Sequence, residues 1–298
     1  MIDAHHHFVD PVVATYPWLT ERYGALRGAF GPSELLPLLV AQHVTATIVV
    51  EARESLDESR FLLACAPTTS FVRGVVAWVD LIGPGVADDI ARLRGAPGGE
   101  RLVGIRDHAR DRLGPNWLGQ QAVRLGLKAV RDADLAFDLL IEPQELPAAL
   151  ELGRALPDLR LVIDHVAKPP ILSRALEPWA GSIAAFRGLP NVWCKVSGMV
   201  TEAAWGSWCT DDLRPYADHA LETFGPNRLL FGSDWPVCLV AASYGQVLST
   251  AQELFRGLSA DERASIFCHS AESAYRLRAC AVASIAGPPG ENLGESPC

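Results

Sequence analysis

The sequence predicts a single (β/α)8 barrel, the TIM-barrel architecture of the α/β class. Short apolar runs rich in β-branched residues recur along the 298 residues, and most are followed by a segment with the spacing of an amphipathic helix. Eight strand-and-helix units in one chain of this length are typical of the barrel, which takes about 250 residues as one domain. A doubly wound open sheet has the same alternation and is the second choice.

The expected strands are short and largely apolar. An uninterrupted run such as Leu161-Val162-Ile163 indicates a parallel strand buried on both faces, whereas a half-exposed strand would alternate apolar with polar residues. We place the strands, in chain order, at Ile2–Phe8, Ala46–Ala52, Phe71–Leu81, Leu102–Arg106, Leu135–Glu142, Arg160–His165, Val192–Ser197 and Arg228–Asp234.

Amphipathic helices are expected between the strands. Ser55 with Glu58, and Ser259 with Glu262, fit the capping box, in which the Ser oxygen and the Glu carboxylate accept hydrogen bonds from the first free N–H groups. Both pairs therefore mark helix starts. The expected helical stretches include Ser33–His43, Ser55–Ala66, Val86–Arg94, Leu118–Ala133, Pro143–Leu156, Leu176–Arg187 and Asp212–Phe224.

The barrel is expected to occupy residues 1–280. Residues 281–298 contain Gly287-Pro288-Pro289-Gly290 and little apolar material, which indicates a flexible C-terminal tail. The connection formed by residues 9–32 is unusually long and contains Tyr16-Pro17-Trp18-Leu19. In a barrel this connection lies over the catalytic end, where a long loop often serves as a lid or a substrate wall.

Composition argues against several classes of partner. The chain has 26 Lys and Arg against 35 Asp and Glu, a net charge of −9, and no basic cluster, so nucleic acid and an anionic membrane surface are not expected partners. Its apolar stretches fall short of the ~20 residues of a membrane span, and the first residues lack the features of a secretory signal. We therefore expect a cytoplasmic protein, as a monomer or homodimer.

The seven cysteines show no CxxC pair, and an odd number cannot be fully paired within the chain. We therefore expect reduced thiols. Cys194 or Cys238 could serve as a nucleophile, but no histidine lies near either in sequence. A catalytic thiol is disfavoured.

The first expected strand ends in three histidines. Because side chains alternate along a strand, His5 and His7 point to one side and His6 to the other, so two imidazoles enter the catalytic end of the barrel. A His-x-His pair at a strand end has a chelating geometry favoured by zinc and similar ions. The alternatives are a chance run of histidines and a residual tag.

Two other strand ends add polar groups to the same catalytic end of the barrel. Asp234 follows the apolar run of the eighth strand, which neighbours the first strand in a closed barrel, so Asp234 can approach His5 and His7. His165 ends the sixth strand and supplies a third imidazole. The alternatives are a turn-capping role for Asp234 and a structural hydrogen bond for His165.

Three cations accompany these groups. Lys195 stands within an apolar strand, where its burial is costly without a task or a partner. Arg106 ends the fourth strand and could bind a carboxylate or polyol oxygens, with an ion pair to Asp107 or Glu51 as the alternative. Lys168 follows His165 at the same end of the barrel.

Taken together, these motifs resemble the amidohydrolase superfamily, and within it the branch of sugar lactonases of the L-fuconolactonase and L-rhamnonolactonase type. The likeness runs from residue 1 to about residue 278 in the order that a barrel requires, and several motifs together are far more specific than a lone His-x-His pair. The motifs are Ile2-Asp3-Ala4-His5-His6-His7-Phe8, Tyr16-Pro17-Trp18-Leu19, Gly104-Ile105-Arg106, Asp164-His165-Val166-Ala167-Lys168-Pro169, Lys195-Val196-Ser197-Gly198 and Gly232-Ser233-Asp234-Trp235-Pro236.

The resemblance implies a hydrolase that opens the lactone ring of an aldonic acid, within deoxysugar or related carbohydrate catabolism. It implies that Asp234 is the general base that takes a proton from water. His5, His7 and His165 would either hold a divalent ion or polarise the lactone carbonyl directly.

The resemblance also implies residues that bind the substrate. Arg106, Lys168 and Lys195 would contact hydroxyl or carboxylate oxygens and stabilise the oxyanion. Trp18 and Trp235 would stack on the apolar face of the sugar.

Metal use stays open at this point. Binuclear members of the superfamily bring a His from strand five and often a carboxylated Lys from strand four, whereas here strand five reads Phe137–Ile141 and strand four ends at Arg106. A two-metal site is therefore not expected, and related lactonases also work without any metal. A single zinc ion could be held by His5, His7, His165 and Asp234.

Two other functions are alternatives to the lactonase. A neighbouring branch of the superfamily contains metal-dependent decarboxylases of aromatic or unsaturated acids, but the strand-five His usual there is missing. A non-catalytic sugar-binding barrel is the other alternative. A pure binder, however, has no need of a carboxylate beside three imidazoles.

Overall fold

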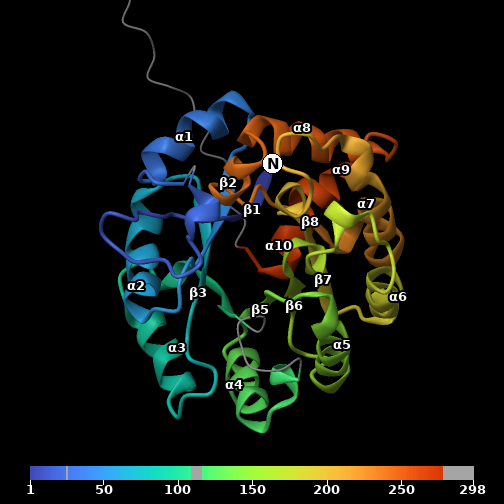
Figure 1. Cartoon of the computed structure of the whole chain (residues 1–298). Coiled ribbons are helices and arrows are strands. Elements are labelled where there is room, and N and C mark those ends of the chain that lie inside the picture. The colour runs from blue at the N-terminus through green and yellow to red at the C-terminus, as the bar shows by residue number, and fades with distance from the viewer. Residues whose placement is uncertain (25, 109–115, 278–298) are drawn as a thin grey trace, which may run out of the picture.

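The structure is a computed structural model, and it describes residues 1–24, 26–108 and 116–277. Eight parallel strands in these ranges form one sheet whose order follows the chain, as predicted (Figure 1). The strands are β1 (Ile2–His6), β2 (Ala46–Val50), β3 (Val72–Ala77), β4 (Leu102–Asp107), β5 (Ala136–Leu139), β6 (Leu161–Ile163), β7 (Val192–Val196) and β8 (Leu229–Phe231).

The sheet curves into a nearly closed barrel because its two ends meet. His6 forms an isolated parallel bridge with Trp235, and the N–H of His7 donates to the Trp235 carbonyl at 2.7 Å. The N–H of Asp234 donates to the carbonyl of His5 at 2.8 Å. These bonds join β1 to the segment that follows β8, so the single barrel is confirmed and the open sheet is wrong.

Helices surround the strands (Figure 1). Each of the first seven strands is followed by one of the helices α1 to α7, and within the described residues α8, α9 and α10 follow β8. They are α1 (Pro32–Ala41), α2 (Leu56–Cys65), α3 (Val86–Gly95), α4 (Gln121–Asp132), α5 (Leu146–Ala155), α6 (Trp179–Ala184), α7 (Thr210–Phe224), α8 (Tyr244–Leu254), α9 (Ala260–Ala264) and α10 (Ser270–Ala274).

Two hydrophobic layers stabilise the barrel. In β2, Val49 belongs to the large layer that also contains helix residues such as Leu39, whereas Ile48 and Val50 belong to a smaller layer. This split follows from the alternation of side chains along a strand. Tyr275, just after α10, packs with the smaller layer, and burial of both layers supplies the main driving force for folding.

Only one of the two predicted capping boxes is complete. Ser259 accepts a hydrogen bond from the N–H of Glu262 at 3.3 Å, and Glu262 accepts one from the N–H of Ser259 at 2.8 Å. Ser55 likewise accepts from the N–H of Glu58 at 3.3 Å. The Glu58 carboxylate, however, accepts from two N–H groups of the loop before α2, so it anchors that loop and does not complete the box.

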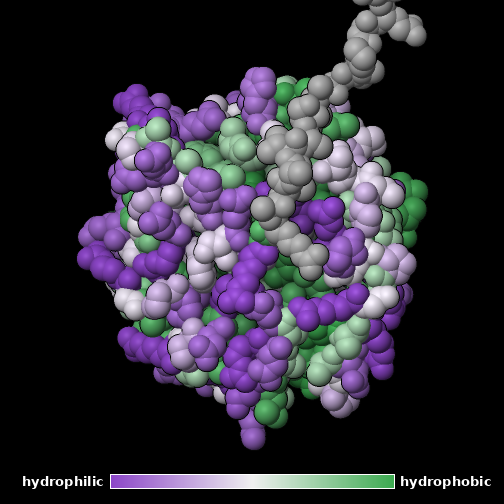
Figure 2. Space-filling view, turned by 180° about the vertical axis from the view of Figure 1, so that it is seen from behind, coloured by the Kyte–Doolittle hydropathy of each residue, from purple (hydrophilic) through white to green (hydrophobic). Residues whose placement is uncertain are grey.

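Polar side chains cover most of the face seen from behind, with hydrophobic residues in smaller groups between them (Figure 2). In the part of the chain that the structure describes, no helix combines the length and the apolar character needed to cross a membrane. The tail predicted at residues 281–298 lies outside the described residues.

Candidate active site

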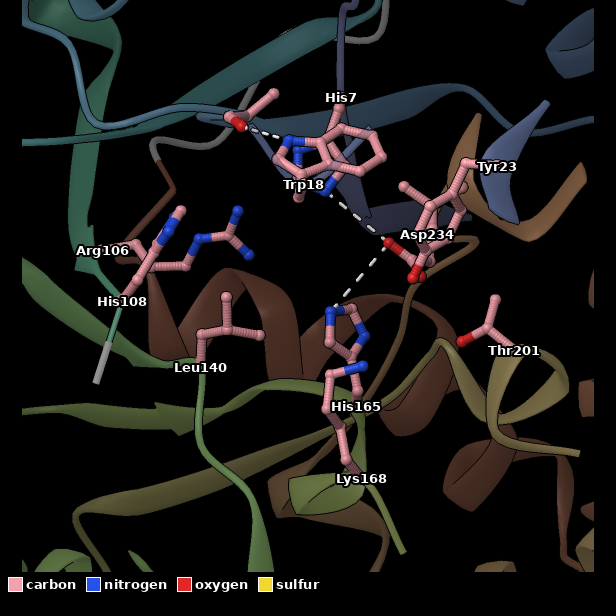
Figure 3. A pocket seen from close by; sticks show the side chains of 12 residues that line it. His7, Trp18, Tyr23, Arg106, His108, Leu140, His165, Lys168, Thr201 and Asp234 are labelled. Carbon is pink, nitrogen blue, oxygen red and sulfur yellow. Dashed lines mark hydrogen bonds and ion pairs between the residues drawn. The ribbon is translucent and has the colours of Figure 1, made fainter. Parts of the chain in front are cut away.

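A pocket lies where loops after the strands converge (Figure 3). The long connection formed by residues 9–32 supplies two aromatic walls, Trp18 and Tyr23, in agreement with the expected position of this loop at the catalytic end. The lining residues are His7, Trp18, Tyr23, Ala52, Arg106, His108, Leu140, His165, Lys168, Thr201, Asp234 and Val237.

The histidines at the end of β1 divide between two sides, as predicted. Nε2 of His6 contacts Oγ1 of Thr47 at 2.9 Å, away from the pocket. His5 and His7 approach each other on the other side, with 3.2 Å between their Nε2 atoms. Nδ1 of His7 donates to the carbonyl of Val50 at 2.9 Å, so in the neutral ring the lone pair belongs to Nε2.

Asp234 lies at the centre of the imidazole cluster. Its Oδ1 is 3.8 Å from Nε2 of His5, 3.6 Å from Nε2 of His7 and 4.0 Å from Nε2 of His165. Figure 3 shows Asp234 between His7 and His165. Because β8 ends at Phe231, Asp234 stands beyond the strand with a left-handed φ of 57°, which turns its carboxylate inward.

His165 is held by an unusual turn after β6. Residues 165–168 all have φ between 49° and 56°, a left-handed conformation that costs an L-residue about 1–2 kcal/mol. Nδ1 of His165 contacts Oγ of Ser197 at 2.9 Å. A Cβ on Gly198, which has a φ of 60°, would lie 2.6 Å from this same Nδ1. The chain thus accepts strain to place one imidazole, as often happens at functional sites.

Burial governs the protonation of this cluster. It lowers the pKa of His165 to about 4 and holds the pKa of His5 well below its ordinary value, so both rings are neutral at pH 7. Burial alone would raise the pKa of Asp234, but the facing imidazoles of His165, His7 and His5 outweigh it and lower that pKa. The site therefore holds an ionised carboxylate beside the neutral imidazoles of His5 and His165.

The geometry fits one divalent metal ion. The ligand atoms of His5, His7 and Asp234 all lie within 4.8 Å of one another. Ligands about 2.1 Å from a tetrahedral ion lie about 3.4 Å apart, close to the separations found here. The hydrogen bond from Nδ1 of His7 to Val50 is the kind of contact that fixes the orientation of a ligating imidazole.

Arg106 reaches the pocket but gives most of its donors to neighbouring groups. Its Nε donates to Oε1 of Glu51 at 2.6 Å, and its Nη2 donates to the Glu51 carbonyl at 2.6 Å. Its Nη1 donates to Oδ2 of Asp164 at 3.0 Å. The ion pair with Glu51 considered from the sequence is therefore present, and Glu51 also accepts from Nε2 of His108 at 2.8 Å.

Lys195 does not face the pocket, so the expectation that it binds substrate is wrong. Its side chain is fully buried below the imidazoles, where Nζ donates to Oδ2 of Asp138 at 2.5 Å. Nζ also lies 2.9 Å from Oδ1 of Asp164 and 3.1 Å from Nδ1 of His5. Its cost of burial is offset by these partners, which come from three other strand ends.

Two of the other expected substrate contacts line the pocket and one does not. Trp18 is fixed by a 2.7 Å hydrogen bond from Nε1 to the carbonyl of Ala52, and Lys168 pairs with Glu202 at 2.6 Å. Trp235 is only 1% exposed, and its ring packs edge-on against Phe30. Stacking of Trp235 on a sugar is therefore wrong, because the ring belongs to the core.

Sequence reasoning overlooked two carboxylates that shape the site. Asp164 connects Arg106, Lys195 and His5, whereas the sequence pattern singles out only its neighbour His165 as a site residue. A carboxylate directly before a strand-end histidine was the available signal. Glu202, which neutralises Lys168, ends the short 3-10 helix Met199–Glu202 after β7, where the sequence carries no comparable signal.

The two cysteines considered as nucleophiles are unsuited to that role. Cys194 and Cys238 are both fully buried, and neither lines the pocket. Burial raises the pKa of each thiol well above its ordinary value, which disfavours the thiolate.

A (β/α)8 barrel that brings a carboxylate and three imidazoles together beyond the ends of its strands has the groups with which hydrolases activate water. The chain is a member of the amidohydrolase family, because the Amidohydrolase family model matches residues 2–277. The family resemblance inferred from the motifs is thereby confirmed.

Individual relatives agree with this assignment. The chain is 39% identical over 282 residues to an L-fucono-1,5-lactonase of Burkholderia ambifaria, covering 93% of this chain and 95% of that protein. A crystal structure of an amidohydrolase from Burkholderia multivorans with bound zinc is 36% identical, with a TM-score of 0.87 over 93% of this chain and 99% of that one. A 2,6-dihydroxybenzoate decarboxylase from Rhizobium shares the fold, with 15% identity and a TM-score of 0.61 over 93% and 98% of the two chains.

Proposed function

We propose that this enzyme hydrolyses the lactone ring of an aldonic acid, with L-fucono-1,5-lactone as the first candidate substrate. The observation that carries the proposal is the convergence of Asp234 with the Nε2 atoms of His5, His7 and His165, all within 4.0 Å of its Oδ1. The similarity to an L-fucono-1,5-lactonase over nearly the whole chain supports the choice of substrate.

Asp234 is the general base in this proposal. Its carboxylate accepts a proton from water while the water oxygen attacks the lactone carbonyl carbon. When the bond between that carbon and the ring oxygen breaks, the proton held by Asp234 is available to the departing oxygen. One hydroxy acid leaves, and the enzyme returns to its starting state.

The remaining groups hold the substrate and polarise it. His165 and His7 flank Asp234 and can orient the water and the carbonyl oxygen (Figure 3). Trp18 and Tyr23 offer apolar ring faces to the C–H groups of a sugar. A zinc ion held by His5, His7 and Asp234 would supply Lewis acidity to the carbonyl oxygen, whereas His165, named from the sequence as a fourth ligand, does not join this group of ligand atoms.

The charges around the pocket favour a neutral, hydroxyl-bearing lactone over a dicarboxylate. Arg106 is paired with Glu51 and Asp164, and Lys168 is paired with Glu202. A substrate carboxylate would therefore meet cations that already have carboxylate partners, and it would lie near Asp234. Neutral hydroxyl groups can use the same donors and acceptors without that cost.

The decarboxylase alternative has weaker support. The decarboxylase neighbour shares 15% of its sequence with this chain, which is evidence for the fold alone. Strand β5 carries Asp138 toward Lys195 and supplies no histidine to the site.

Acid release followed with a pH indicator tests the proposal. L-fucono-1,5-lactone, L-rhamnono-γ-lactone and a dicarboxylate lactone would be compared on untreated enzyme, chelator-treated enzyme and enzyme reloaded with zinc. We expect turnover of a neutral aldonolactone. Turnover that is lost with the chelator and restored by zinc would assign a working metal, and turnover that survives would assign a metal-free mechanism. Silence across all neutral lactones would overturn the lactonase.

A further inference from the structure

Beneath the active site, the buried Lys195 side chain contacts Nδ1 of His5, the ring nitrogen opposite the one proposed to bind a metal. Its Nζ lies among Oδ2 of Asp138 at 2.5 Å, Oδ1 of Asp164 at 2.9 Å and Nδ1 of His5 at 3.1 Å. Tyr275 holds the far side of this network by donating to Asp138 at 2.8 Å. All of these side chains are at most 2% exposed, so bulk water does not compete for the contacts.

Nδ1 of His5 has two neighbours that require opposite tautomers. Nζ of Lys195 is a donor, so its 3.1 Å contact requires a lone pair on Nδ1. Oδ1 of Asp164 is an acceptor 3.2 Å away, so it requires a proton on Nδ1. A neutral imidazole carries one ring proton, and satisfying either contact therefore excludes the other.

When no metal is bound, the contacts at Nε2, on the opposite side of the His5 ring, determine which tautomer forms. Nε2 of His7 carries a lone pair, because Nδ1 of His7 donates to the Val50 carbonyl. This lone pair faces Nε2 of His5 at 3.2 Å, so a proton on that atom completes a hydrogen bond. Nη1 of Arg106 also approaches Nε2 of His5, but at the longer distance of 3.4 Å. The contacts with Lys195 at 3.1 Å and with His7 at 3.2 Å have hydrogen-bond geometry and agree on the tautomer with its proton on Nε2. Oδ1 of Asp164, although 3.2 Å from Nδ1, forms no hydrogen bond in this arrangement.

Metal coordination requires the other tautomer. A cation held by His5 and His7 would need the Nε2 lone pairs of both rings, so His5 would have to carry its proton on Nδ1, toward Asp164. We infer that Lys195 and Asp164 form a tautomer selector for His5, in which Lys195 opposes metal binding and Asp164 supports it. Lys195 is thus a positioning residue that acts through His5. This inference rests on the proposed function only in taking His5 as part of the working site.

Zinc affinity tests the selector. The dissociation constant would be measured for metal-free protein by competition with a chromogenic chelator. Lys195→Met removes the donor to Nδ1, and we expect zinc to bind at least tenfold more tightly. The double variant Lys195→Met/Asp138→Asn removes one charge of each sign and guards against misfolding caused by an unpaired carboxylate. We expect the same tightening in the double variant.

Two controls separate the selector from general effects of charge. Asp138→Asn alone retains the Lys195 donor to His5 and is expected to give no tightening. Lys128→Met removes an exposed cation on α4, and its zinc affinity is expected to match that of the wild type. A folded double variant whose zinc affinity stays within twofold of the wild type would overturn the inference.

The tautomer can also be read directly in the wild-type protein. Nitrogen NMR on 15N-histidine-labelled enzyme, with His5 assigned by its His5→Gln spectrum, should place the proton on Nε2 without metal and on Nδ1 with zinc. A proton on Nδ1 in the metal-free protein would contradict the selector. Neither measurement uses a lactone, so failure of the selector and failure of the lactonase assignment are distinguishable.

Discussion

Asp234 and His5, at opposite ends of the barrel sequence, are joined through both backbone and side chain. The N–H of Asp234 donates to the carbonyl of His5 at 2.8 Å, and Oδ1 of Asp234 lies 3.8 Å from Nε2 of His5. Asp3 reinforces the junction by accepting from the N–H of Ser233 at 2.8 Å. The same contacts bring the two ends of the sheet together and assemble the proposed catalytic centre, so closure of the fold and formation of the site are coupled.

Asp234→Asn should remove the general base with little change in volume. We expect kcat for the neutral lactone to fall by about 10²–10⁴, the usual contribution of a positioned base, while the circular dichroism spectrum is unchanged. Asp158→Asn, on an exposed residue, serves as the matched control and should retain full activity. If Asp234→Asn kept most of the wild-type rate, another group would have to be the base.

Gly198→Ala should displace the His165 ring. The added Cβ would lie 2.6 Å from Nδ1 of His165, and the φ of 60° at this position is unfavourable for alanine. We expect a lower kcat together with a loss of about 1–3 kcal/mol in the free energy of unfolding, measured with urea. Gly188→Ala is the control, because a Cβ there meets nothing within 4 Å. Wild-type kcat in Gly198→Ala would show that the site tolerates movement of His165.

Glu202→Gln should change substrate preference. Glu202 pairs with Lys168 at 2.6 Å, and the change leaves that cation free to bind an anionic group. We expect kcat/KM for a carboxylate-bearing lactone, relative to a neutral one, to rise by about tenfold, which corresponds to about 1.4 kcal/mol. Glu222→Gln, at the exposed ion pair with Arg187, is the control. An unchanged ratio in Glu202→Gln would argue that Lys168 does not contact the substrate.

Glu58→Gln should alter the pH dependence of stability. Burial, assisted by the nearby charge of Glu51, raises the pKa of Glu58 from 4.5 to about 7. The folded state therefore binds this proton more tightly than the unfolded state, so wild-type stability is lost relative to the Gln variant as the pH rises from 4.5 to 7. The difference in unfolding free energy should grow by up to about 3 kcal/mol over that window and then level off. A constant difference across the window would show that Glu58 titrates normally in the folded protein.

Much of the architecture could be predicted because strands and helices follow from local sequence patterns. Apolar runs and helical spacing mark strands and helices, and their alternation is sufficient to indicate a barrel. Strand alternation likewise predicted that His5 and His7 share a side and that His6 does not, as its contact with Thr47 confirms. The element ends were less predictable, since β8 stops at Phe231 and leaves Asp234 three residues beyond the strand.

Three-dimensional packing, in contrast, set the roles of the cations and of Trp235. The sequence predicts that Lys195 and Arg106 bind substrate. In the structure their N–H groups instead donate to carboxylates from other strands, namely Asp138, Asp164 and Glu51. Such pairing depends on the register of neighbouring strands, which no local pattern encodes. The amino-acid sequence alone was therefore sufficient to identify the barrel and the strand ends that bear its chemistry. Which side chains face the substrate, and which hold one another in place beneath it, was determined by distances between segments far apart in the chain.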